Sequence, residues 1–143
     1  MDDPAKPDNR QEATQGASMI VLRRDAVLMV ERARAPNKGL WSFPAGRAEP
    51  SEDAEANARR ELKEETRLTV GAVVRLGEFR PEGSRFRVAV FAARAGKGTP
   101  RAGDDAAQAE FVPLSIVLER PLTAGAAGWV ARAIAALADP PLR

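Results

Sequence analysis

Three glutamates near the middle of the chain, Glu61, Glu64 and Glu65, lie within five consecutive positions. The 143-residue sequence contains no histidine and no cysteine, which excludes histidine general bases, thiolate nucleophiles and zinc sites built from these residues. Acid–base or metal chemistry in this chain would therefore depend on carboxylates. Ligand sets made only of oxygen atoms favour Mg²⁺ or Mn²⁺ over zinc or iron.

The segment that carries these glutamates has the pattern of a helix. Ser51 is the predicted N-cap, and Glu52 and Asp53 follow it as acids that interact favourably with the positive end of the helix dipole. The helix is predicted to run to about Thr66. The residues just before it, around Gly46, form a glycine turn that delivers the chain to the helix.

The glutamates border the side of this helix that is predicted to be buried. At about 100° per residue, an apolar stripe forms from Ala54, Ala58 and Leu62. Glu61 and Glu65 lie along its edge as like charges at i,i+4, which repel each other more strongly when partly buried. A cation held between the carboxylates would relieve this repulsion. From the charge pattern alone, an equal alternative to a metal site is a helix in which these glutamates form salt bridges with Arg59, Arg60 and Lys63.

The spacing through this segment resembles the sequence box of the Nudix hydrolases, G-x5-E-x7-R-E-U-x-E-E-x-G-U, where U is apolar. Gly46 is followed after five residues by Glu52, and after seven more by the run Arg60-Glu61-Leu62-Lys63-Glu64-Glu65. Arg67 stands where the pattern has its second glycine. Such a glycine suits a left-handed helix end, in which an arginine would cost about 1 kcal/mol. We therefore expect Arg67 to adopt that conformation at some cost in stability.

The resemblance implies a divalent-metal-dependent hydrolase with Mg²⁺ or Mn²⁺ as cofactor. It implies that the metal is held by Glu61, Glu64, Glu65 and the backbone carbonyl of Gly46. Glu61 would be a ligand or the general base, Glu64 a catalytic metal ligand, and Arg60 would orient the glutamates. A further acid usually comes from a loop outside the box. Asp105, beside Asp104, is the candidate for a ligand or base, and the alternative is that both only make the loop soluble.

The resemblance also suggests a substrate, a nucleoside diphosphate linked to another group. The stretch PRAGDDAAQAEFVPL resembles the corresponding loop and strand of the ADP-ribose pyrophosphatase-like group, which makes ADP-ribose or a similar sugar nucleotide the first expectation. Gln108 departs from the acid found there in many relatives. The alternatives are a (d)NTP pyrophosphatase of the pool-cleansing type and a non-catalytic nucleotide-sensing domain. The candidate substrate contacts are Arg47 and Arg23 for phosphates and Trp41 for a base, with the core as the alternative for Trp41.

The rest of the chain supplies short strands and one more helix. Strands are predicted at 18–23, 26–31, 40–43, 68–79, 86–93 and 110–113, and a closing helix at 123–138. Gly96, Gly98, Pro100 and Gly103 predict a mobile loop between residues 95 and 105. This order indicates an α/β (α+β) class with helices packed on a mixed sheet, and it resembles the α/β/α sandwich of the Nudix family. Residues 1–16 are expected to form a disordered tail and 17–143 one domain.

Composition narrows the partners. The chain is 44% hydrophobic and 29% charged, with a net charge of +2 and only 5% aromatic residues, a balance that argues against a nucleic-acid partner. The polar start is not a secretory signal, and no apolar run is long enough to span a bilayer. We therefore expect a cytoplasmic monomer or homodimer that binds a small nucleotide and no membrane.

Overall fold

The computed structural model describes residues 14–81 and 85–138 of the chain. These residues form seven strands, two α-helices and one short 3-10 helix. The strands are β1 (Gly16–Arg23), β2 (Ala26–Arg32), β3 (Trp41–Ser42), β4 (Ala45–Arg47), β5 (Val70–Phe79), β6 (Val88–Ala95) and β7 (Ala106–Pro113). The helices are α1 (Ala54–Thr66), α2 (Ala126–Leu137) and the 3-10 helix η2 (Val117–Glu119).

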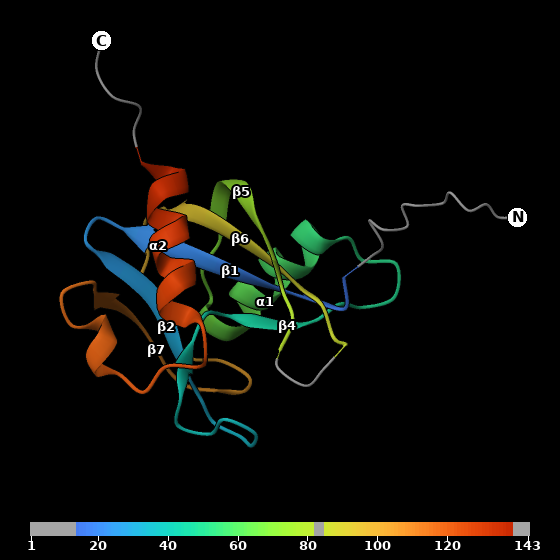
Figure 1. Ribbon diagram of the computed structural model, residues 1–143, viewed down its shortest axis with the longest axis horizontal. Coiled ribbons are helices and arrows are strands. Elements are labelled where there is room, and N and C mark those ends of the chain that lie inside the picture. Colours follow the sequence, from blue (N-terminus) through green and yellow to red (C-terminus); the bar gives the residue numbers. More distant parts are fainter. Residues whose placement is uncertain (1–13, 82–84, 139–143) are drawn as a thin grey trace, which may run out of the picture.

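The strands make one mixed sheet that is covered by a helix on each side. The main order is β3-β2-β1-β6-β5, while β4 pairs with β1 and β7 pairs with β2. Strands β1 and β6 are parallel, and the other pairs are antiparallel. Helix α2 crosses one face of the sheet, and α1 lies behind the opposite face (Figure 1). The predicted α/β/α sandwich with a mixed sheet is confirmed.

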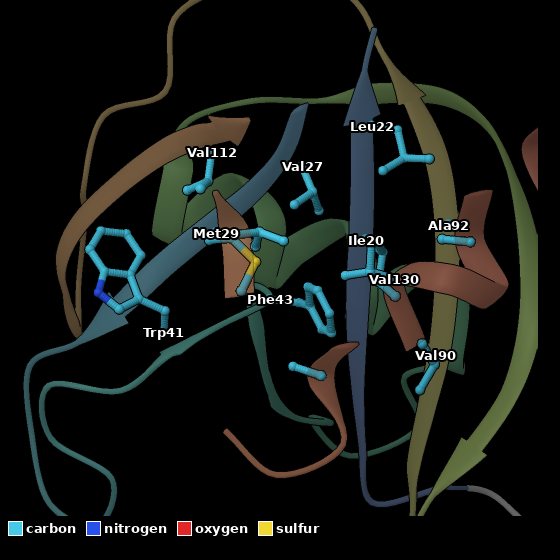
Figure 2. Packing of buried hydrophobic residues seen from close by; sticks show 13 residues of the cluster. Ile20, Leu22, Val27, Met29, Trp41, Phe43, Val90, Ala92, Val112 and Val130 are labelled. Carbon is cyan, nitrogen blue, oxygen red and sulfur yellow. The ribbon is translucent and has the colours of Figure 1, made fainter. Parts of the chain in front are cut away.

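Strand β1 is the shared wall of two hydrophobic cores. Because successive side chains point to opposite faces, Ile20 packs on the α2 side, and Met19 and Val21 pack on the α1 side. Figure 2 shows the α2-side cluster, in which Ile20 lies with Val130 of α2 and with side chains of β2 and β6. A strand covered on both faces reads as a continuous apolar run. This explains why β1 and β2 were recognisable in the sequence.

The predicted N-cap of α1 is wrong. The cap is Asp53, whose Oδ1 accepts a hydrogen bond of 2.8 Å from the Ala56 N–H, and Ser51 has a positive φ of 66° in the preceding turn. Two hydrogen bonds close that turn. The Glu52 N–H donates to the Glu49 carbonyl, and the Glu49 N–H donates to Oε1 of Glu52. Glu52 is therefore used in the turn, and the helix begins three residues later than Ser51.

The loop before β7 is attached to the C-terminal end of α1. Backbone hydrogen bonds of 2.9 Å and 3.1 Å connect Arg101 N–H to the Thr66 carbonyl and Gly103 N–H to the Glu65 carbonyl. A Cβ atom at Gly103 would overlap the Glu64 carbonyl oxygen, so glycine permits this close approach. Strand β7 begins at Ala106, four residues earlier than predicted, because it pairs with β2 along its length.

Several predictions fall partly on residues outside the described ranges. Residues 1–13 of the predicted tail lie outside them, whereas Gly16, also assigned to the tail, is the first residue of β1. Residues 82–84, in the predicted turn after β5, and 139–143 also lie outside. Within the described parts of the chain, no helix has the length and apolar character needed to cross a membrane.

Candidate active site

Strand β4 and helix α1 lie in close contact at Gly46. A Cβ atom at this position would overlap the carboxylate of Glu61, so only glycine allows Glu61 to lie against the strand. The neighbouring Ala45 N–H points at Oε1 of Glu65, 3.4 Å away. The structure thus brings Gly46, Glu61 and Glu65 close together, and their role as metal ligands stays a prediction.

Glu61 and Glu65 form a coupled pair of carboxyl groups. Glu61 is buried, with 9% of its surface exposed, and burial raises its pKa, an effect that the Arg60 charge opposes. Burial, followed by the charge of Glu61, raises the pKa of Glu65 to about 8. Each carboxyl also acts on the pKa of the other, and Glu61 raises the pKa of Glu65. The pair therefore resists carrying two negative charges together.

Arg60 lies in the middle of the acidic residues. Its guanidinium donates to Glu52 through two bonds of 2.8 Å and 2.9 Å, to Glu61 at 3.0 Å and to Glu64 at 3.2 Å. The hydrogen bond from Arg60 lowers the pKa of Glu52 to about 2. A fifth hydrogen bond, 2.8 Å to the Arg47 carbonyl, fixes the guanidinium against β4. This geometry agrees with Arg60 as the group that orients the glutamates and with Glu52 as its structural partner.

The side chains of this site have the chemistry to bind a divalent cation, although they are not arranged around one common point. In the ranges that the structure describes, no three acidic side chains are placed to hold a metal ion as they stand. Arg60 lies between Glu61 and Glu64 and supplies the positive charge there. The Arg60 charge lowers the pKa of Glu61, but burial outweighs it, and burial also raises the pKa of Glu65. The donors are oxygen atoms, which suit Mg²⁺ or Mn²⁺.

The backbone of β4 offers two carbonyl groups with different surroundings. The hydrogen-bonded pairs that flank Gly46 are Met19 with Pro44 and Gln15 with Ala48. Since Gly46 faces Ala17 in the same ladder, alternation directs the Gly46 carbonyl toward β1 and the Ala45 carbonyl away from it, on the edge where the Ala45 N–H meets Glu65. A backbone carbonyl such as that of Ala45 has no side-chain signature, so the sequence could not indicate it as a candidate.

The candidate fourth acid does not join the glutamates. Asp105 forms an exposed ion pair with Arg34 at 3.2 Å, and its carbonyl accepts from the Ala33 N–H. Asp104, with a positive φ of 49°, is exposed beside it. The loop nevertheless lies at the end of α1 that carries Glu64 and Glu65, as Gly103 shows. The role of Asp105 as a ligand or base stays a prediction.

A cavity of about 430 Å³ reaches Ala45 of β4, although neither Glu61 nor Glu65 lines it. It lies between the sheet and α2, and its walls include Phe43, Phe79, Trp129, Ser42 and Thr123. Ala45 belongs both to this wall and to the Glu65 contact. Arg32 also lines the cavity, and its charge acts to lower the pKa of Glu65. The cavity and the carboxyl groups are therefore neighbours, linked by β4 and Arg32.

The three predicted substrate contacts lie in different places. Trp41 is 6% exposed in the α2-side core (Figure 2). The guanidinium of Arg120 lies over its ring at 4.4 Å. Arg47 lies on β4 with its guanidinium 4.8 Å from the Phe86 ring. Arg23 lies at the other end of β1, where it donates to the carbonyls of Gly96 and Gly98. Only Arg47 is close to the acidic residues, and all three roles stay predictions.

Comparison with known proteins places this fold and site in context. The NUDIX domain family matches residues 13–133. ADP-ribose pyrophosphatase of Methanocaldococcus jannaschii is 34% identical over 101 residues, which cover 67% of this chain and 59% of that protein. A putative 8-oxo-dGTP diphosphatase of Bacillus subtilis (strain 168) is 40% identical over 67 residues, 46% of this chain and 43% of that protein. The chain thus spans less than two thirds of either relative.

The same fold occurs in solved structures. The Nudix domain of Shewanella oneidensis NrtR, solved with ADP ribose, has a TM-score of 0.78 at 20% identity and covers 92% of this chain and 93% of its own. A MutT Nudix hydrolase from Burkholderia pseudomallei has a TM-score of 0.71 at 23% identity, over 85% of this chain and 98% of its own. At such identities the likeness establishes the fold alone. Since the family match covers most of the chain, including the whole segment from Gly46 to Leu68, the protein belongs to the Nudix family.

Proposed function

We propose that this protein hydrolyses a phosphoanhydride bond of a nucleotide with the help of Mg²⁺ or Mn²⁺. The observation that carries the proposal is the junction at Ala45, which lines the cavity while its N–H contacts Glu65. A nucleotide in the cavity would bring its phosphates to the coupled pair of Glu61 and Glu65. The cavity has the size and the mixture of aromatic, hydroxyl and cationic walls that suit a small ligand.

The residues of this chain divide the chemical work. Glu61, Glu64 and Glu65, with a β4 backbone carbonyl, would hold the ion, and Ala45 is a candidate for that carbonyl beside the predicted Gly46. A bound Mg²⁺ or Mn²⁺ supplies positive charge against the pyrophosphate oxygens and lowers the pKa of water. Glu65 has to lose its proton first, and Glu64 has to exchange Arg60 for the ion. Glu61 would serve as a ligand or as the general base.

ADP-ribose or a similar sugar nucleotide is the proposed substrate. The support is the Methanocaldococcus jannaschii relative, which carries the name ADP-ribose pyrophosphatase and matches 67% of this chain. The Bacillus subtilis relative, named as an 8-oxo-dGTP diphosphatase, supports the second candidate, a (d)NTP pyrophosphatase. A non-catalytic sensor is the third candidate. It is disfavoured because all the acids of the box are present at their positions.

A substrate panel tests this proposal. The purified chain is incubated with ADP-ribose, other sugar nucleotides, dNTPs and 8-oxo-dGTP in Mg²⁺ or Mn²⁺, and the phosphorus products are separated. We expect AMP and ribose phosphate from ADP-ribose, and no product with Glu64→Gln or with EDTA. Hydrolysis of triphosphates only would select the second candidate. No hydrolysis with either metal would contradict the enzymatic proposal, and full activity of Glu64→Gln would contradict the assignment of the metal ligands.

A further inference from the structure

Asn57 is a fully buried amide on the same face of α1 as the coupled glutamates. Its exposed fraction is 0%, and it precedes Glu61 by four residues and Glu65 by eight, so the three side chains follow one line along the helix. All three meet β4. Glu61 lies against Gly46 and Glu65 reaches the Ala45 N–H, while Asn57 lies at the other end of the line.

The amide of Asn57 connects the helix to the backbone of β4. Its Nδ2 donates to the Gly46 carbonyl at 3.3 Å and to the Arg47 carbonyl at 3.4 Å. The opposite orientation of the amide would place Oδ1 against these two carbonyl oxygens, so the contacts determine which end faces the strand. Nothing in the Nudix-like spacing requires an amide at this position, which falls within the x7 stretch of the box.

The other end of the same amide carries an energetic cost. Oδ1 of Asn57 is buried and has no hydrogen-bond partner among the described residues. A buried polar atom without a partner destabilises the fold, and alanine would be the better helix former at a buried position. A residue that breaks a local rule of stability in this way is expected where function requires it. In this structure, the two hydrogen bonds to β4 are the interactions that would explain an asparagine at this position.

We propose that Asn57 is a positioning residue of the metal site. The hydrogen bonds from Nδ2 fix the position of β4 along the axis of α1. That position determines where the β4 carbonyls lie relative to Glu61 and Glu65. The inference rests on the proposed function, because it assumes that these groups bind a cation. Residues that orient metal ligands typically change metal affinity by about 10- to 100-fold when they are removed.

The test measures Mn²⁺ binding by electron paramagnetic resonance and, separately, thermal unfolding of the metal-free protein. For Asn57→Ala we expect the Kd for Mn²⁺ to rise about tenfold. The melting temperature without metal should stay the same or rise by about 2 °C, because the loss of two long hydrogen bonds is offset by removal of the unpaired Oδ1. Asn57→Leu keeps most of the side-chain volume without the donor and should give the same loss of affinity.

The matched control is Ala58→Gly, at the next buried position of the same helix. It should lower the melting temperature, since glycine weakens a helix interior, and leave the Kd for Mn²⁺ within about twofold. If wild type binds Mn²⁺ and Asn57→Ala binds it equally well, the role of Asn57 is refuted while the proposed function stands. The role is also refuted if Asn57→Ala loses affinity only in proportion to its loss of stability and Ala58→Gly loses affinity to the same extent. If wild type does not bind Mn²⁺ at all, the proposed function itself fails.

Discussion

The two helices that cover the sheet are built for different tasks. Helix α2 buries only apolar side chains, Ala126, Val130 and Ala133, and begins at Gly125 without a side-chain cap. Helix α1 begins with a hydrogen-bonded cap, Asp53, and buries polar side chains beside its apolar stripe. The buried polar residues of α1 are Asn57, Glu61 and Thr66.

The difference shows where stability and chemistry are located. The α2 face is stabilised by apolar area removed from water, and the buried residues of α2 carry no charge. The α1 face buries carboxyl groups with raised pKa values and one unpaired amide oxygen, which oppose folding. Changes at buried α2-side residues that do not line the cavity, such as Val130, should therefore affect mainly unfolding, and changes on the α1 face should affect mainly metal binding and hydrolysis.

The largest effect is expected from Glu65→Gln. Glutamine keeps an oxygen for the Ala45 N–H but cannot become negative, so kcat on the cleaved substrate should fall by at least about 100-fold. The melting temperature of the metal-free protein at pH 8 should stay the same or rise, because a partly buried charge is removed. Ile134→Ser on the exposed side of α2 is the control and should keep activity within about twofold. A variant with near wild-type kcat would remove Glu65 from the site.

A second prediction concerns the pH dependence of stability without metal. The pKa of Glu65 is about 8 in the folded chain and about 4.5 ordinarily, so between these values the folded state holds a proton that the unfolded state has lost. Stability should therefore fall as pH rises from about 5 to 8. Unfolding in EDTA should show this slope for wild type, and a smaller slope for Glu65→Gln. Equal slopes for the two proteins would show that another group titrates.

A buried substitution on the α2 side should lower stability and leave metal binding unchanged. Val130 is 6% exposed, and Val130→Ala removes two buried methyl groups, which should lower the free energy of unfolding by about 2 kcal/mol and the melting temperature by about 5 °C. The Kd for Mn²⁺ should be unchanged when measured well below the melting temperature. A weakened Kd at retained fold would show that the two faces are coupled through β1.

The smallest effect is expected at the end of α1. Arg67 has φ 68° and ψ 11°, the left-handed conformation that the sequence indicated, and its N–H bonds the Lys63 carbonyl. Arg67→Gly should raise the melting temperature by about 3 °C, because glycine adopts this conformation without the roughly 1 kcal/mol cost of a side chain. Activity should be unchanged. A lower melting temperature would mean that the arginine side chain stabilises the loop around Gly103 by more than this cost.

Much of this division could be predicted from the sequence, wherever one segment carries its own signal. Apolar runs predicted β1 and β2. The box spacing selected Gly46, Glu61 and Glu65, which lie close together, whereas Glu64 is bonded to Arg60. Strand β4 could not be predicted, because three residues, Ala-Gly-Arg, have no alternation and become a strand only by pairing with β1. The contacts of Asn57 likewise depend on where β4 lies. The N-cap was misplaced because the hydrogen bonds between Glu49 and Glu52 place Ser51 in a turn before the helix.

The most direct test of the account is a titration of the metal-free protein with Mn²⁺ at pH 8, followed by electron paramagnetic resonance. We predict binding by wild type that is lost in Glu64→Gln and in Glu65→Gln and retained in Val130→Ala. Affinity should also rise with pH up to about 8, as Glu65 loses its proton. Equal binding by wild type and both glutamine variants, or no binding by wild type, would contradict the claim that the acidic face of α1 is a divalent metal site.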